Sequence, residues 1–220
     1  MTKNLQDSMI ESELIEPEPL SPVARQAIAT LRTLIPKRRV SFLEAMHIAE
    51  RQATALRALL NVTGPGFPVE RIVELPKVTV MFDRGIPISG ASFWDGGQWV
   101  IDINADEPPA RQRFTLLHEL KHIIDHPHQD VLFSPARTTG TSQRELAADY
   151  FAACVLMPAR QFRAAYRKQP DHGALAELFG VHPGGIDMRL SELGMADGIP
   201  SPQMPPQTSR APSKQQEEHR

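Results

Sequence analysis

The chain has 220 residues, with 24 Lys or Arg against 26 Asp or Glu, so its formal net charge is −2 when histidine is neutral. This balance argues against a polybasic binder of nucleic acid or membrane surfaces, and a hydrophobic fraction of 41% excludes disorder of the whole chain. No apolar run approaches the roughly 18 residues of a membrane span, and residues 1–20 lack the basic and apolar regions of a secretory signal. We therefore expect a cytoplasmic protein, in which the single cysteine, Cys154, is a small core residue.

Both ends of the chain are predicted to be disordered. Residues 1–20 form an acidic segment with few apolar side chains, and residues 199–220 form a proline-rich tail. Such segments bury too little apolar surface to offset the entropy lost on ordering. The remaining chain suits a main domain at residues 21–158, followed by a C-terminal helical subdomain at residues 159–198.

The first ordered elements are predicted to be two helices. Residues 22–35 and 42–60 carry apolar side chains at helical spacing, and each segment ends near a proline or glycine. Ser41 is the expected N-cap of the second helix, because Glu44 follows three residues later, as in a capping box.

Three strands are predicted next. Residues 77–82 and 98–104 alternate apolar and polar side chains and are rich in β-branched residues, while residues 86–93 form a weaker strand between them. The glycines between these segments favour turns, so we predict a small antiparallel three-stranded meander.

Helices are predicted for the rest of the ordered chain. Asp106 is the expected cap of the next helix, which runs to about His126. Its successor is predicted to begin near Ser142, after a loop at residues 128–141. Shorter helices are expected at residues 160–168, 171–180 and 184–193.

The motif HExxH lies inside the helix that follows the strands, as His118-Glu119-Leu120-Lys121-His122. One helical turn separates His118 from His122, so two neutral imidazoles can bind the same zinc ion. Glu119 is offset on the helix and can act as general base toward a zinc-bound water. A polar helix face is often merely solvated, but the apolar residues on both sides of this motif favour a metal site.

Two residues compete for the third ligand position. His128 follows His118 by ten residues, as in the extended motif of metzincins, but Asp125 stands where that motif requires glycine. Glu145 follows His122 by 23 residues, at the predicted start of the next helix. We favour Glu145, with the fourth position left to water.

An alternative interpretation of Glu145 is purely structural, because Ser142 and Glu145 together match a capping box. Asp149 argues against this alternative. It lies one turn beyond Glu145, where a carboxylate can accept the free ring N–H of a zinc-bound histidine. We therefore expect Asp149 to orient one of the two ligands.

These residues resemble the ImmA/IrrE family of metallo-endopeptidases. The likeness is strongest through Ser89-Gly90-Ala91-Ser92 and residues 99–104, 111–126 and 145–158, and extends loosely to residues 179–181 and 189–190. The resemblance implies an α+β, zincin-like fold that packs the small antiparallel sheet against the HExxH helix, and a helix-turn-helix-like C-terminal appendage. It also implies one zinc ion held by His118, His122 and Glu145, with Glu119 as base.

The chain departs from the family pattern at two positions. Lys121 stands where the family has glycine, and Ala147 stands where a second glutamate is common. Neither change removes an expected ligand, although Lys121 adds a charge close to the site. The resemblance further implies a bacterial hydrolase that cleaves a transcription regulator, commonly a helix-turn-helix repressor or an antitoxin encoded nearby.

The expected substrate is an extended peptide that pairs with a sheet edge, and residues 86–93 are the expected edge strand. An oxyanion donor is also needed. The sequence leaves it open among Tyr150, His126, His128 and Arg113.

The sequence also permits two rival interpretations. Residues 175–190 have the rhythm of a DNA-binding helix-turn-helix, but residues 171–197 hold five acids against Arg189 as the only Arg or Lys, so direct nucleic-acid binding is not expected. The other rival is a non-catalytic, zinc-stabilised protein that binds a partner in a toxin–antitoxin or mobile-element system. Glu119 argues against it, because a purely structural zinc site needs no base.

Overall fold

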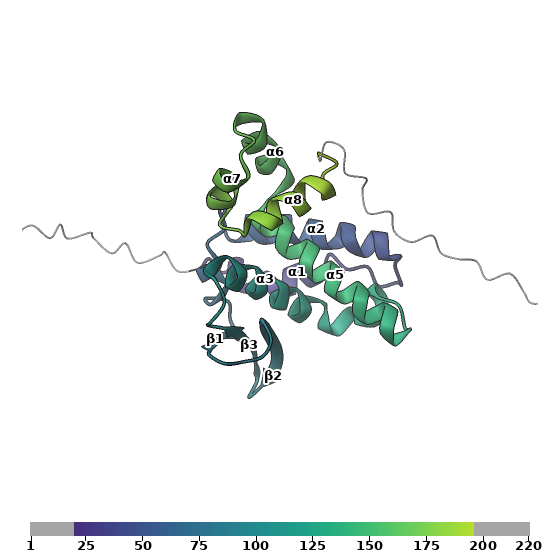
Figure 1. Ribbon diagram of the computed structural model, residues 1–220. Helices are drawn as coiled ribbons and strands as arrows, with labels where there is room; N and C mark the ends of the chain where they lie inside the picture. Colours follow the sequence, from purple (N-terminus) through teal and green to yellow (C-terminus); the bar gives the residue numbers. More distant parts are fainter. Residues whose placement is uncertain (1–19, 196–220) are drawn as a thin grey trace, which may run out of the picture.

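The computed structural model describes residues 20–195, and shows an α+β fold with a small three-stranded sheet at one end and a helical C-terminal region at the other (Figure 1). Nearly all of the predicted acidic segment 1–20 and the whole of the predicted tail 199–220 lie outside the described residues. Among the residues described, no helix is long and apolar enough to span a membrane.

The N-terminal helices cover the core from one side. A 3-10 turn at Ala24–Gln26 leads into α1 (Ala27–Arg32), which is shorter than the predicted helix. The second helix, α2 (Phe42–Leu59), begins as predicted, because the Ser41 hydroxyl accepts a hydrogen bond from the Glu44 amide at 3.2 Å.

The sheet contains β1 (Val78–Asp83), β2 (Gly90–Asp95) and β3 (Gln98–Asn104) in the order β1-β3-β2. β2 and β3 form an antiparallel hairpin. Gly96 and Gly97 make its two-residue turn with φ of 54° and 92°, values that favour glycine.

The predicted antiparallel meander is wrong in one pairing, because β1 pairs with β3 in parallel. β3 is the most buried strand, with Val100, Ile101 and Ile103 all buried, and the central position gives it a neighbour on each edge. Alternation in the sequence predicts a strand and its buried face, but it does not choose the strand's neighbours.

The helix α3 (Pro109–Asp125) packs against β2 and β3 on one side and against the later helix α5 on the other. β2 crosses α3 closely at Gly90, where a Cβ would come within 2.6 Å of the Thr115 methyl group. The predicted N-cap is wrong: Pro108 occupies that position, while the Asp106 carboxylate accepts a hydrogen bond from the Gly85 amide at 2.9 Å.

The helix α5 (Arg137–Leu156) begins five residues before the predicted start at Ser142. The predicted loop also contains a 3-10 turn (His126–His128) and the short helix α4 (Gln129–Leu132). Residues of low helix propensity fill the first turns of α5, including Gly140, which packs against the Ser134 carbonyl with no room for a side chain. Tertiary packing therefore extends this helix beyond its local preference.

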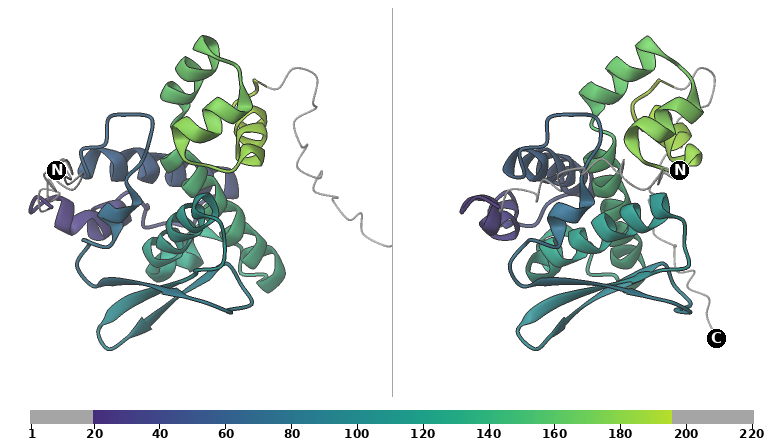
Figure 2. Two further views of the ribbon diagram at one scale, coloured as in Figure 1. Left: turned by 60° about the vertical axis from the view of Figure 1, so that its left-hand side comes forward. Right: turned by 90° about the vertical axis from the view of Figure 1, so that its left-hand side faces the viewer.

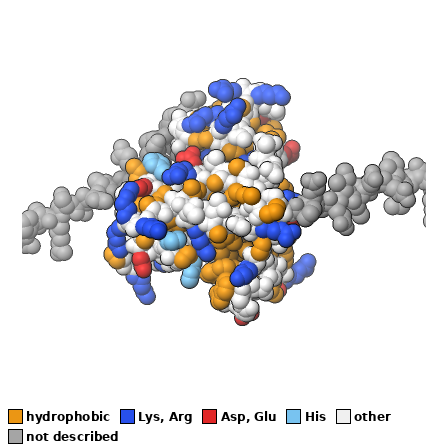
Figure 3. Space-filling view, turned by 180° about the vertical axis from the view of Figure 1, so that it is seen from behind, with side chains coloured by type: hydrophobic (Ala, Val, Ile, Leu, Met, Phe, Trp, Pro, Cys, Tyr) orange, Lys and Arg blue, Asp and Glu red, His pale blue; other side chains and the backbone are white. Residues whose placement is uncertain are grey.

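The C-terminal region contains α6 (Ala159–Lys168), α7 (His172–Phe179) and α8 (Pro183–Glu192), close to the predicted bounds. These helices gather over one end of α5 (Figure 2). The buried Arg189 fixes α8 there, because its Nε donates to the Met157 carbonyl at 3.0 Å. At the opposite end of the molecule, apolar side chains are exposed on and beside the sheet (Figure 3), including Met81, Phe82, Phe93 and Trp94.

Candidate metal centre

The helix α3 brings its three motif residues together. The Nε2 atoms of His118 and His122 lie 3.0 Å apart, as their spacing of one helical turn predicts. A carboxylate oxygen of Glu119 completes a group whose ligand atoms lie within 4.8 Å of one another. Such a group could hold a metal ion.

Glu145 approaches both imidazoles from α5. Its Oε2 lies 3.3 Å from the Nε2 atom of His118, and its Oε1 lies 3.7 Å from the Nε2 atom of His122. The capping-box alternative is wrong, because Ser142 lies inside α5 and its hydroxyl donates to the Thr138 carbonyl at 3.1 Å. Glu145 is thus two turns inside its helix and faces the imidazoles.

Asp149 lies one turn beyond Glu145 and contacts the other side of the His118 ring. Its Oδ1 atom is 2.8 Å from Nδ1 of His118. A proton on Nδ1 would be donated to this carboxylate, which leaves the lone pair of Nε2 directed toward His122 and Glu145.

The two histidines have opposite pKa shifts, because only His118 is bound to a carboxylate that outweighs the effect of burial. For His122, desolvation together with the positive charges of His118 and Lys121 lowers the pKa to about 4. For His118, desolvation alone would lower the pKa, but the hydrogen bond to Asp149 and the nearby acids outweigh it and raise the pKa. His122 is therefore neutral at pH 7, the form in which an imidazole binds a metal.

Ser92, for which the sequence indicated no separate role, contacts Glu119. Its hydroxyl donates to the Glu119 Oε2 atom at 2.8 Å, from the face of β2 that is turned toward α3. Burial raises the pKa of Glu119, and this hydrogen bond opposes part of the rise. Ser92 lies opposite Ile101 in the hairpin, so strand alternation could have indicated which way it faces.

A polar cavity of about 310 Å³ opens beside these residues. Arg111 and Phe114, from the first half of α3, line it together with Ser89 from the segment before β2. Arg111 donates to the Ser89 hydroxyl at 3.3 Å. The complete lining is Ser89, Gly90, Arg111, Phe114, Thr115, His118, Glu119, Glu145 and Asp149.

Other candidates from the sequence contact different parts of the fold. His128 lies in the 3-10 turn after α3 and, among the described residues, is not a member of the group that could hold a metal. The His126 ring packs edge-on against Trp99, with ring centroids 5.0 Å apart. Two further candidates also have partners elsewhere: Arg113 donates to the Phe67 carbonyl, and Tyr150 lies under the Arg189 guanidinium.

Lys121 points into the protein interior, not into the cavity. Its ammonium group is buried and donates to both carboxylate oxygens of Asp125 and, at 2.9 Å, to Oε1 of Gln52 on α2. The positive charge of Lys121 is thus paired with Asp125 in the interior, and the hydrogen bond to Gln52 ties α3 to α2.

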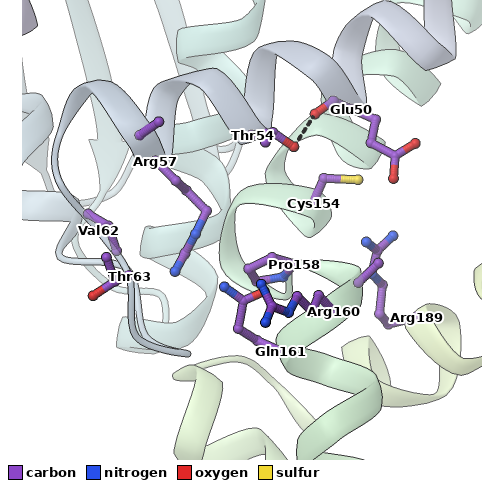
Figure 4. A pocket seen from close by; sticks show the side chains of 12 residues that line it. Glu50, Thr54, Arg57, Val62, Thr63, Cys154, Pro158, Arg160, Gln161 and Arg189 are labelled. Carbon is purple, nitrogen blue, oxygen red and sulfur yellow. Dashed lines mark hydrogen bonds between the residues drawn. The ribbon is translucent and has the colours of Figure 1, made fainter.

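A larger cavity of about 510 Å³ lies between α2, the end of α5 and α6 (Figure 4), and shares no lining residue with the polar cavity. Two of the guanidinium groups around it are engaged by main-chain carbonyls at the end of α5. Arg57 donates to the Val155 carbonyl at 2.7 Å, and Arg189 donates to the Met157 carbonyl. These arginines therefore hold the helices together.

Comparison with known proteins places the chain in a family. No curated protein matches it in sequence. Among solved structures, it is similar to a Mycobacterium tuberculosis transcriptional regulator, with 20% identity and a TM-score of 0.49 over 75% of this chain and 62% of that one. The chain thus corresponds to less than two thirds of that regulator's length. The model of the IrrE N-terminal-like domain, a peptidase family, matches residues 77–191, more than half of the chain, and the protein therefore belongs to this family.

Proposed function

We propose that this protein is a zinc-dependent endopeptidase that cleaves a peptide bond in a regulatory protein. The observation that carries the proposal is the convergence of two imidazole nitrogens and the Glu145 carboxylate from different helices, with the Glu119 carboxylate beside them. Membership of a peptidase family supports the same conclusion.

The chemistry of the donor set suits zinc. His118, His122 and Glu145 would supply two nitrogens and one carboxylate, the set that catalytic zinc sites commonly use. Asp149 would keep the His118 ring in the tautomer that offers Nε2 to the ion. Bound zinc would polarise the scissile carbonyl and lower the pKa of the attacking water.

Glu119 is placed to move the protons of the reaction. Its carboxylate would accept a proton from the attacking water and then deliver it to the departing amine. Burial raises the pKa of this carboxylate, which makes it a stronger base than an exposed glutamate. Ser92 holds the Oε2 atom at 2.8 Å, so the side chain is oriented before substrate binds.

The edge strand β2 is the proposed docking surface for substrate. It pairs only with β3 in the described sheet, and its residue Ser92 reaches Glu119. A peptide could add to the free edge of β2 through main-chain hydrogen bonds, which would bring an extended backbone alongside the catalytic carboxylate.

The proposed target is a DNA-binding repressor or an antitoxin in the same cytoplasm, as the family resemblance implies. Direct DNA binding by this chain is not part of the proposal. Arg189 is the only Arg or Lys in residues 171–197, and it is buried and bound to Glu192 at 2.7 Å, so it does not face phosphates.

Co-expression with a repressor encoded nearby tests the function. Wild type should produce a repressor fragment when zinc is supplied, and Glu119→Gln should retain zinc while losing the fragment. If Glu119→Gln has the same biological effect as wild type, the non-catalytic partner-binding alternative is correct instead.

A further inference from the structure

A third cavity, of about 450 Å³, shares part of its lining with the polar cavity. It lies between the first half of α3, the end of α5 and the start of α8. Its surface is mainly apolar, and no Asp or Glu lines it. The side chains that give it this character include Phe114, Ala153, Met157, Val181 and Met188.

Two residues join this apolar cavity to the candidate metal centre. Arg111 and Phe114 line both cavities. Phe114 lies one turn before His118, with ring centroids 6.5 Å apart, and the Arg111 guanidinium lies over the Phe114 ring at 5.9 Å. The two cavities are therefore adjacent, with these two side chains as their common wall.

We propose that this apolar cavity is the specificity pocket of the enzyme and receives a large aliphatic or aromatic side chain of the substrate. This inference rests on the proposed peptidase function. An extended peptide advances about 3.3 Å per residue, so the separation of Phe114 from His118 corresponds to about two residues. The selected side chain should therefore lie within about two residues of the scissile bond.

The lining of the cavity explains the preference. A lysine side chain would lose its hydration there without gaining a partner of opposite charge, because no Asp or Glu lines the cavity. Met157 and Met188 are flexible and can adapt to side chains of different shape. Met188 is 56% exposed at the rim, where a substrate side chain would cover it.

The C-terminal helices take part in the proposed specificity pocket. The start of α8 forms one wall of the cavity, and Arg189 ties that helix to the Met157 carbonyl. The helix-turn-helix-like rhythm of this region then serves substrate selection instead of DNA binding.

Gly185 offers a direct test, because it lines the cavity within α8. A Cβ added there would meet the Met157 Cε atom at 3.8 Å and the Val181 Cβ atom at 3.9 Å, which are ordinary contacts. A leucine should therefore be tolerated by the fold and occupy the cavity. Gly173→Leu is the matched control, since Gly173 also lies in a helix and lines neither cavity.

The experiment incubates the zinc-loaded full chain with a library of twelve-residue peptides randomised at every position, and identifies the cleavage sites by mass spectrometry. Wild type should favour Leu, Ile, Phe or Met at one position near the scissile bond by about 10- to 100-fold in kcat/KM over Lys or Ala, as expected from burial of one large apolar side chain. Gly185→Leu should remove this preference, and Gly173→Leu should keep it.

A binding measurement adds a readout that does not require turnover. Fluorescence polarisation measures the affinity of the protein for a labelled Leu-containing peptide and for its Ala counterpart. Zinc-loaded Glu119→Gln should bind the Leu peptide more tightly than the Ala peptide, and Glu119→Gln/Gly185→Leu should bind both equally. Met188→Glu, at an exposed position, should weaken binding of the Leu peptide and provides a second variant if Gly185→Leu is unfolded.

Cleavage without apolar preference, or a preference that both cavity variants retain, overturns the specificity pocket alone. If wild type cleaves no peptide and no repressor, the proposed function fails together with it.

Discussion

His118 and Asp149 join the two helices of the candidate metal centre through a contact of 2.8 Å between Nδ1 and Oδ1. His118 belongs to α3 and Asp149 to α5, so one hydrogen bond both orients a ring and links the two helices. Several testable features of the site depend on such contacts between α3, α5 and the sheet.

Asp149→Ala should lower zinc affinity by about 10- to 100-fold, the usual effect of removing the carboxylate that orients a metal-bound histidine. The His118 ring would lose its fixed tautomer while all three proposed ligands remained. Competition with a chromophoric chelator measures the change. Asp130→Ala, an exposed substitution on α4, is the control, and equal affinities for the two variants would contradict the assigned role.

Glu145→Ala should abolish stoichiometric zinc binding, because it removes one of three proposed protein ligands. His128→Ala should bind zinc as wild type does. Metal content after dialysis distinguishes the two ligand sets, and the opposite pattern would show that the metzincin-like alternative is the correct one.

Ser92→Ala should reduce kcat by about fivefold while zinc affinity stays unchanged, since a single hydrogen bond of this kind contributes on the order of 1 kcal/mol. The variant leaves the Glu119 carboxylate in place but removes the group that orients it. Steady-state kinetics of repressor cleavage, with zinc content measured in parallel, test this prediction. A change confined to KM would instead indicate that Ser92 serves only substrate binding.

Asp125→Ala should destabilise the protein by about 3–5 kcal/mol, because the buried Lys121 ammonium would lose its opposite charge. The double substitution Lys121→Met with Asp125→Leu should recover most of that loss, since it removes both charges together. Urea denaturation measures the free energy of unfolding. If the single and double variants are equally unstable, packing rather than charge explains the effect.

Cys154 should not react with a thiol reagent in the folded protein. It is 4% exposed, and burial raises the pKa of its thiol to about 11, so almost no thiolate is present at pH 8. A colorimetric disulfide reagent should detect the thiol only after addition of guanidinium chloride. Rapid modification of the native protein would show that this part of α5 opens to solvent.

Local patterns in the sequence determined the parts of the site that lie within one element. The spacing of His118 and His122 places both imidazoles on one face of any α-helix, and the same period places Glu145 and Asp149 on one face of α5. The helices α2, α6, α7 and α8 were predictable for the same reason, because their apolar residues recur at the helical period.

Only the tertiary structure decided how these elements meet. The parallel pairing of β1 with β3, the early start of α5 and the direction of Lys121 all depend on contacts between residues distant in sequence. The same is true of Ser92, which reaches Glu119 from a different element. The spacing of apolar side chains determines which face of an element is buried. Which elements become neighbours depends on packing energies summed over the whole core, and a local sequence pattern does not carry this information.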